Sequence, residues 1–136
     1  MTTSKDEATR VLSQVKRVIR TNYSNPPTHG GTIVASVLTS PELRAMWEQE
    51  LGEMRDRIKS MRNALVDKLA AKGVKTDFSF VKAQRGMFSY SGLTSAQVDR
   101  LRTEHGIYAV STGRICVAAL NTHNIDAVVN AIADVL

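Results

Sequence analysis

Two short stretches of the chain each hold one arginine among residues that restrict the backbone. The first runs from Arg20 to Pro27 with the sequence RTNYSNPP, and the second runs from Ser111 to Ala118 with the sequence STGRICVA. A guanidinium is planar and stays protonated at any working pH, so Arg20 and Arg114 could each grip a carboxylate through two parallel hydrogen bonds. Simpler explanations remain open, since Arg20 would suit the C-terminal end of a helix dipole and Arg114 would suit the edge of a strand.

Metal and thiol chemistry receive little support from the sequence. The three histidines, His29, His105 and His123, are too dispersed to predict a metal site. The single cysteine, Cys116, lies in an apolar segment typical of a strand, which indicates an inert buried thiol. One cysteine permits no internal disulfide, so we expect a reducing, cytoplasmic compartment.

Composition restricts the class of protein. The chain has 136 residues, of which 43% are hydrophobic, and this size suits one globular domain. No apolar run approaches the roughly 20 residues needed to cross a bilayer, so we expect no membrane association. The net charge of +5 makes an anionic ligand or nucleic acid worth considering. Because the basic residues are scattered and aromatic residues make up only 5% of the chain, we predict that nucleic acid is not a partner.

The longest predicted element is a helix between Ser40 and Gly73. Ser40 is a favourable N-cap, Pro41 suits the first helical position, and Gly73 suits a left-handed C-terminal cap. One face carries an apolar seam whose members are Trp47, Leu51, Met54, Ile58, Met61 and Leu65. The charged residues, Arg62 among them, fall largely elsewhere. We expect a core helix covered by the flanking segments, and a coiled-coil dimer helix is the alternative, although the seam lasts only about three heptads.

The segment before the long helix predicts two further helices. Ser4 and Glu7 have the spacing of a capping box, and the apolar residues that follow predict a helix to about Arg20. Asn25 and the two prolines after it end that helix. The apolar run from Thr32 to Leu38 fits either a strand or two helical turns, and we expect a short buried helix there.

Beyond the long helix the hydrophobic period changes. Short strands are expected over 78–80, 87–91, 107–110 and 115–120. Thr94 and Gln97 cap a helix that stops at Gly106, and Thr122 or Asn121 caps a final helix. The predicted fold class is therefore α/β (α+β), with a small sheet of about three to four short strands packed against several helices including one long helix.

Three motifs give the chain a family resemblance. RTNYSNPP at 20–27, GMFSYSGL at 86–93 and GRICVA at 113–118 follow one another in an order and spacing too specific to arise by chance. Over residues 4–136 the sequence resembles, in register, the C-terminal third of the class I, fold type I, pyridoxal-phosphate-dependent aspartate and aromatic amino-acid aminotransferases. The resemblance implies that residues 1–136 are the small-domain region of a homodimeric transaminase, which moves an amino group between amino-acid and 2-oxo-acid substrates.

The resemblance also implies roles for individual residues. Arg114 matches the position that holds the substrate α-carboxylate, and Phe88 matches an aromatic residue that lines the site. Arg20 matches the arginine that reaches across the dimer to the side-chain carboxylate of aspartate or glutamate, and that swings out for aromatic substrates. Ser24 and Asn25 lie beside this cross-dimer contact and are weaker candidates.

The three motifs lack the cofactor-binding residues of the family. The family needs a lysine that forms a Schiff base with pyridoxal phosphate, an aspartate beside the pyridinium nitrogen, and a phosphate cup. Lys5 lacks the glycine and arginine that accompany such a lysine, and no other lysine fits better. The resemblance therefore implies a fragment without catalytic residues or the large cofactor-binding domain, inactive by itself. The segments 85–90 and 115–121 look closer to the aromatic-accepting branch than to the strict aspartate branch.

Two other readings of the sequence remain open. A basic α/β module that binds an anion or RNA without catalysis fits the charge and size, and it predicts steeply salt-dependent binding. A folded dimerisation piece is also compatible, and it would expose an apolar patch where the large domain normally packs.

Overall fold

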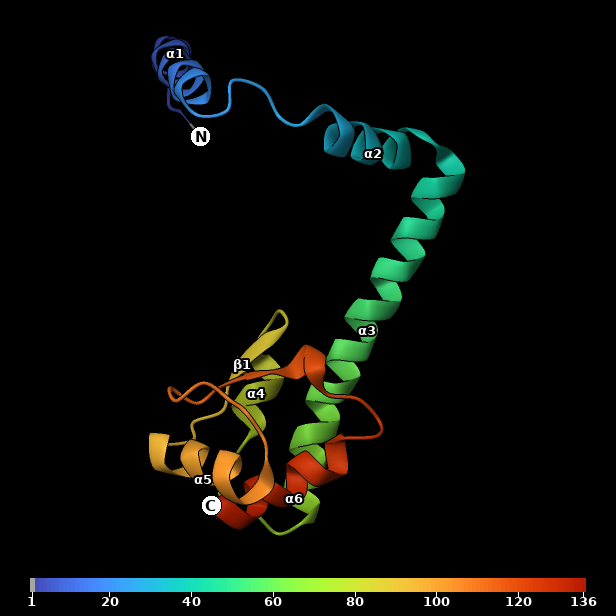
Figure 1. Ribbon diagram of the computed structural model, residues 1–136, viewed down its shortest axis with the longest axis vertical. Coiled ribbons are helices and arrows are strands. Elements are labelled where there is room, and N and C mark those ends of the chain that lie inside the picture. The colour runs from blue at the N-terminus through green and yellow to red at the C-terminus, as the bar shows by residue number, and fades with distance from the viewer. Residues whose placement is uncertain (1) are drawn as a thin grey trace. The chain divides into compact units, whose positions relative to one another are not determined.

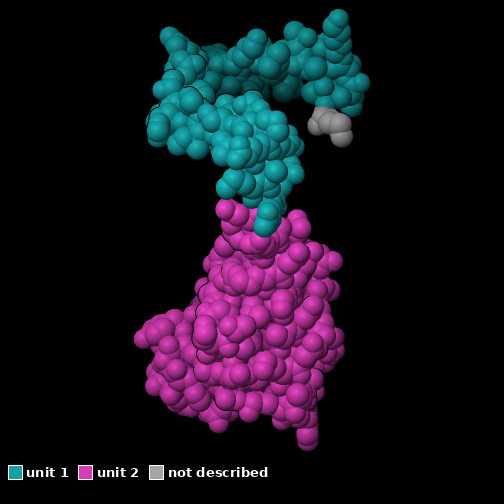
Figure 2. All heavy atoms as spheres, turned by 90° about the vertical axis from the view of Figure 1, so that its right-hand side faces the viewer, with its two compact units in different colours: residues 1–49 teal, residues 50–136 magenta. Residues whose placement is uncertain are grey.

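The computed structural model describes residues 2–136 and shows a mostly helical chain with one small sheet (Figure 1). The elements are α1 (Lys5–Thr21), α2 (Thr28–Thr39), α3 (Pro41–Ala71), α4 (Ser79–Ala83), β1 (Phe88–Tyr90), α5 (Ser95–His105), β2 (Arg114–Cys116), the 3₁₀ helix η1 (Val117–Ala119) and α6 (Ile125–Val135). The chain divides into two compact units, residues 1–49 and 50–136, and the expectation of one domain stays a prediction (Figure 2).

The first unit contains α1, α2 and the beginning of α3. The predicted helix start at Ser4 is confirmed, since its hydroxyl accepts from the backbone N–H of Glu7. The carboxylate of Glu7 turns to the backbone N–H and hydroxyl of Thr3 instead of closing the capping box. The helix expected over 32–38 exists as α2, but the prediction that it is buried is wrong, because neither α1 nor α2 has a buried residue. Periodicity shows which face is apolar and does not show what covers it.

The long helix α3 begins and ends where its capping residues predict. The hydroxyl of Ser40 lies 3.4 Å from the backbone N–H of Leu43. Gly73 has a φ of +78°, the left-handed conformation of a helix C-terminal cap. The seam is buried only toward the C-terminal end of the helix, where Met61 and Leu65 enter the core, whereas Trp47 is 43% exposed.

The hydrophobic core of the second unit lies between α3, α4, α5, η1 and α6. Its most deeply buried side chains are Leu65, Leu69, Val81, Leu101, Val117, Val129 and Ile132. Burying each such side chain contributes about 1.5–3 kcal/mol, so this cluster stabilises the unit that carries the sheet.

The sheet is smaller than predicted. Over residues 2–136 it consists of β1 and β2, which pair antiparallel with Phe88 opposite Cys116, Ser89 opposite Ile115 and Tyr90 opposite Arg114. The strands expected over 87–91 and 115–120 are therefore confirmed in shortened form. The second ends early because the backbone of residues 117–119 turns into η1.

The other two expected strands are absent from the described residues. The one over 78–80 is wrong because residues 79–83 form α4, which follows a local turn in which the carboxylate of Asp77 accepts from the backbone N–H of Ser79 at 2.7 Å. The one over 107–110 is wrong because the Ile107 N–H is taken by the carbonyl of Leu101 at the end of α5. The carbonyl of Val110 accepts instead from the N–H of Gly113 in a turn.

The helix α5 follows its predicted caps, whereas the prediction that Thr122 or Asn121 is the N-cap of α6 is wrong, because Asn124 holds that position. Thr94 and Gln97 form a complete capping box for α5, and Gly106 ends it with a φ of +66°. The side-chain oxygen of Asn121 accepts from the N–H groups of His123 and Asn124, so Asn121 caps the turn that leads into α6. No helix among residues 2–136 is long and apolar enough to cross a membrane.

Candidate functional site

The two strands bring Arg114 and Phe88 together on one face of the sheet. Phe88 and Tyr90 are two residues apart on β1 and so point to the same side, and Tyr90 lies directly opposite Arg114. The Arg114 guanidinium carbon lies 5.0 Å from the centroid of the Phe88 ring, within cation–π range. The sheet therefore presents a cation on an aromatic platform, and both side chains remain exposed to solvent.

A shallow, open cavity of about 310 Å³ has both of these side chains in its lining. It is lined by Gln84, Phe88, Ser89, Tyr90, Thr112 and Arg114. Arg114 is the only charged side chain in this lining, so no carboxylate of the cavity wall competes for its guanidinium. The remaining polar groups are neutral hydrogen-bonding groups, and such a cavity suits a small ligand that carries a carboxylate.

The backbone before Arg114 is held in a restricted conformation. Gly113 has a φ of +82°, and a Cβ at this position would lie 2.6 Å from the carbonyl oxygen of Leu93. Both the backbone N–H and the hydroxyl of Ser91 donate to the Gly113 carbonyl, at 2.9 and 2.6 Å. Only glycine fits this close approach, which fixes where β2 begins and hence where Arg114 leaves the backbone.

Gln84 completes the free edge of β1. Its side-chain amide donates to the carbonyl of Tyr90 at 3.0 Å and accepts from the N–H of Tyr90 at 2.8 Å. One side chain thus satisfies both backbone groups of an edge residue as a third strand would. The cavity wall is therefore held at Tyr90 from both sides.

The residue that sequence reasoning missed is Arg62 on α3. Its exposed fraction is only 4%, and its guanidinium donates to the carbonyls of Val81 and Gly86 and to the hydroxyl of Ser89. Burial, followed by the charge of Arg85, lowers the pKa of Arg62 below its ordinary value. The assignment of Arg62 to the polar side of the helix is wrong.

A signal for Arg62 was present in the helical spacing. It lies four residues after Ile58 and three before Leu65, the separations that place side chains on one face of a helix. Its charge hid this position, because arginine is rarely fully buried.

Arg20 belongs to the first unit, whereas Arg114 belongs to the second. The Arg20 guanidinium donates to the hydroxyl of Ser24, which has the unusual φ of +68° for a residue with a side chain. Ser24 and Asn25 line a shallow hollow of about 530 Å³ with Tyr23 and the two prolines. Arg20, in the last turn of α1, therefore lies beside the loop that carries Ser24 and Asn25.

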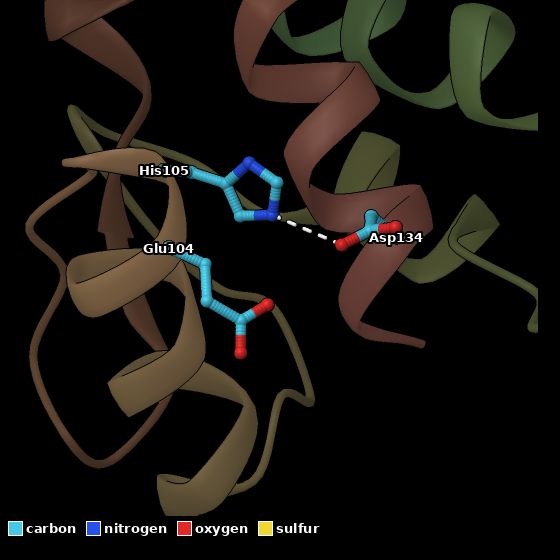
Figure 3. A group of neighbouring side chains, drawn as sticks. All are labelled: Glu104, His105 and Asp134. Carbon is cyan, nitrogen blue, oxygen red and sulfur yellow. Dashed lines mark hydrogen bonds and ion pairs between the residues drawn. The ribbon is translucent and has the colours of Figure 1, made fainter.

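A group of possible metal ligands occurs elsewhere in the second unit. Oxygen and nitrogen atoms of Glu104, His105 and Asp134 lie within 4.8 Å of one another, and Figure 3 shows the imidazole directed toward Asp134. The guanidinium of Arg100 already contacts both carboxylates, at 2.8 Å from Glu104 and 3.3 Å from Asp134. Since a cation already pairs with both acids, we interpret the group as a salt-bridge network between α5 and α6.

The cavity does not fit a covalently held pyridoxal phosphate. Its lining contains no lysine, and Lys5 lies at the exposed start of α1 in the other unit. The lining of this cavity therefore offers one arginine and neutral polar groups, without a lysine amine beside them.

The chain is similar in sequence to known aminotransferases. The Aminotransferase class I and II family matches residues 1–132. The aspartate aminotransferase of Pseudomonas aeruginosa is 73% identical over 136 residues, which are 100% of this chain and 34% of that protein. The aromatic-amino-acid aminotransferase of Escherichia coli is 49% identical over 131 residues, which are 96% of this chain and 33% of that protein.

Solved structures of aminotransferases are also similar to this chain. The aromatic-amino-acid aminotransferase of Burkholderia pseudomallei, covalently bound to pyridoxal phosphate, matches with a TM-score of 0.91 and 79% identity over 100% of this chain and 34% of that chain. The chain thus spans about a third of the length of these relatives. By the family match and these identities, the chain belongs to the class I and II aminotransferases.

Proposed function

We propose that this chain is the C-terminal, carboxylate-binding region of a homodimeric transaminase that acts on amino acids and 2-oxo acids. The observation that carries the proposal is the exposed Arg114 guanidinium, which rests on Phe88 in a cavity whose wall holds no carboxylate. Both substrate classes of a transaminase carry a carboxylate beside the reacting carbon. One arginine can therefore hold the substrate before and after the amino group is transferred.

In this proposal, Arg114 binds the substrate α-carboxylate and orients the substrate. Two parallel N–H donors of its guanidinium meet the two oxygens of the α-carboxylate, which fixes both the distance and the plane of the substrate. The Phe88 ring covers one face of the guanidinium and limits its rotation. Such orientation lowers the entropic barrier of the reaction without any proton transfer by the arginine.

In this proposal, Arg20 determines the specificity between dicarboxylic and aromatic substrates. It acts from the partner subunit on the side-chain carboxylate of a dicarboxylic substrate, with Ser24 and Asn25 in the turn beside it. The relatives named above include aspartate and aromatic-amino-acid aminotransferases, which supports a parent that accepts both classes.

The cofactor belongs to the full-length parent in this proposal. When bound, pyridoxal phosphate supplies the electron sink that weakens the bonds of the substrate α-carbon. The lysine that holds it lies outside residues 1–136, so the isolated chain is inactive. The parent works in the cytoplasm.

Borohydride reduction of the full-length protein tests this assignment. Reduction fixes pyridoxal phosphate to its lysine, and peptide mapping locates the modified residue. We expect the modification outside residues 1–136, in a protein whose mass is well above 14.9 kDa. A modified lysine within residues 1–136 would contradict the assignment. A native product of 14.9 kDa that binds polyanions with steep salt dependence would favour an anion- or RNA-binding module.

A further inference from the structure

We propose that Arg62 is a positioning residue for carboxylate binding, and that it acts through Ser89 on the strand that carries Phe88. The inference rests on the proposed function, because it assigns Arg62 a part in the affinity for the substrate carboxylate. Arg62 is buried and does not line the cavity around Arg114, so it cannot touch the ligand there.

Arg62 ties three points of one short segment to α3. Its Nη1 donates to the carbonyl of Val81 in α4 at 3.3 Å and to the hydroxyl of Ser89 in the middle of β1. Its Nη2 donates to the carbonyl of Gly86, just before β1, at 2.6 Å. All three acceptors are uncharged, so the guanidinium organises backbone and hydroxyl groups instead of neutralising an acid.

Ser89 lies on β1 between Phe88 and Tyr90, two residues that line the cavity around Arg114. Ser89 is 2% exposed and its hydroxyl meets Arg62, although the residue also contributes to the cavity lining. Because side chains alternate along a strand, Phe88 and Tyr90 lie on the face opposite to that hydroxyl. The cross-strand partner of Ser89 is Ile115, which directly follows Arg114. Holding Ser89 against α3 therefore fixes the height and rotation of Phe88 beneath the guanidinium.

An arginine at this position needs a reason beyond packing. A buried guanidinium is expensive to desolvate, and an apolar side chain of similar volume beside Leu65 would avoid that cost. An apolar side chain cannot donate hydrogen bonds to α4, the turn at Gly86 and β1 at the same time. Arg62 therefore contributes by holding these three segments together through one guanidinium.

Kinetics of the full-length enzyme test the inference with three variants. Arg62→Met removes all three hydrogen bonds at similar volume, and Ser89→Ala removes only the hydroxyl acceptor. Arg57→Met is the matched control, because Arg57 also lies on α3 and donates to two carbonyls, those of Ala118 at 3.1 Å and Leu120 at 2.8 Å, which follow β2. For each variant, KM and kcat for an amino-acid substrate are measured with the unfolding midpoint.

A positioning role predicts a separation of the two kinetic constants. Arg62→Met should raise KM about two- to fivefold, as loss of the Phe88 ring would, and change kcat less than about twofold, because the Phe88 platform is misaligned while the cofactor site is intact. Ser89→Ala should raise KM about two- to fivefold. Arg57→Met should lower the unfolding midpoint and leave KM within about twofold of the wild type.

A double-mutant cycle shows whether the effect passes through Phe88. In a Phe88→Leu background, Arg62→Met should change KM less than about twofold, because the platform is already lost. A full, multiplicative effect of Arg62→Met in that background would overturn the inference.

Two further outcomes would also overturn it. One is a folded Arg62→Met enzyme with unchanged KM, and the other is an equal rise in KM for Arg57→Met. If Arg62→Met does not fold, Ser89→Ala decides, and an unchanged KM for that variant refutes the role. Failure of the proposed function looks different: the wild-type parent lacks transaminase activity, or Arg114→Ala leaves carboxylate binding intact.

Discussion

The guanidinium of Arg114 lies 5.0 Å above the ring of Phe88, although the two residues come from different strands and different motifs of the sequence. Antiparallel pairing with Tyr90 opposite Arg114 makes this contact, and Gly113, Ser91 and Gln84 hold the strands in that register. The relationship places an exposed guanidinium against an aromatic ring.

Replacing Phe88 by Leu should weaken carboxylate binding by the full-length enzyme about two- to fivefold, because a cation–π contact at an exposed site contributes about 0.5–1 kcal/mol. The measurement is KM for an amino-acid substrate. Tyr108→Leu is the control, since Tyr108 is 81% exposed and outside the cavity around Arg114, and it should leave KM unchanged. Equal effects of both substitutions would show that the ring beneath Arg114 has no special role.

Replacing Gly113 by Ala should destabilise the fold by about 2–4 kcal/mol, because the new Cβ meets a carbonyl oxygen in a left-handed backbone conformation. Gly73→Ala is a matched control with a φ of +78° and nothing within 4 Å of the added Cβ. It should cost only about 1 kcal/mol. Urea unfolding of residues 1–136 measures both values, and similar losses would contradict the steric argument.

The Glu104 carboxylate should stabilise the chain in a pH-dependent manner. Its hydrogen bond from Arg100 lowers the pKa of Glu104, so the folded state binds the proton less well than the unfolded state. The contribution is complete above the ordinary pKa of a glutamate and is lost as the pH falls through the lowered pKa of the folded state. The stability difference between wild type and Glu104→Gln should therefore shrink from pH 7 to pH 3.

The same comparison in an Arg100→Met background provides the control for Glu104. Without the guanidinium, Glu104→Gln should have a smaller effect that changes little with pH, because the cause of the pKa shift is gone. An unchanged pH dependence in that background would mean that another group perturbs Glu104.

Replacing Arg20 by Leu should damage dicarboxylic substrates far more than aromatic ones. If Arg20 grips the second carboxylate, its loss should lower kcat/KM for aspartate by about 100-fold or more and for an aromatic amino acid by less than about tenfold. Arg17→Leu, also an exposed arginine on α1, should affect both classes little. Equal losses for both substrate classes would refute the cross-dimer assignment.

Local signals predicted the helices well, because caps act within a few residues. Ser40, Thr94 and Gly106 mark helix ends that the structure confirms. A strand was mispredicted around Phe78 because apolar and polar residues do alternate there. The carboxylate of Asp77 instead accepts from the backbone N–H of Ser79, and α4 begins at that residue. A competition between local hydrogen bonding and periodicity cannot be decided from the pattern alone.

The site was predictable only in part. The arginine motif pointed to Arg114, whereas the contact with Phe88 depends on a strand register that needed the structure. Arg62 was misassigned because its charge outweighed its place on the apolar face, and its three acceptors belong to a later segment of the chain. Long-range polar contacts of this kind leave no periodic trace in the sequence.

The central claim, that Arg114 holds the substrate α-carboxylate, is tested most directly by kcat/KM of the Arg114→Ala full-length enzyme. We expect a loss of roughly 3–5 kcal/mol in transition-state stabilisation, or about two to three and a half decades in kcat/KM, with the protein still folded. Arg102→Ala, an exposed arginine paired with Asp99 on α5, is the control and should change kcat/KM less than about twofold. A loss of less than tenfold for Arg114→Ala would contradict the account.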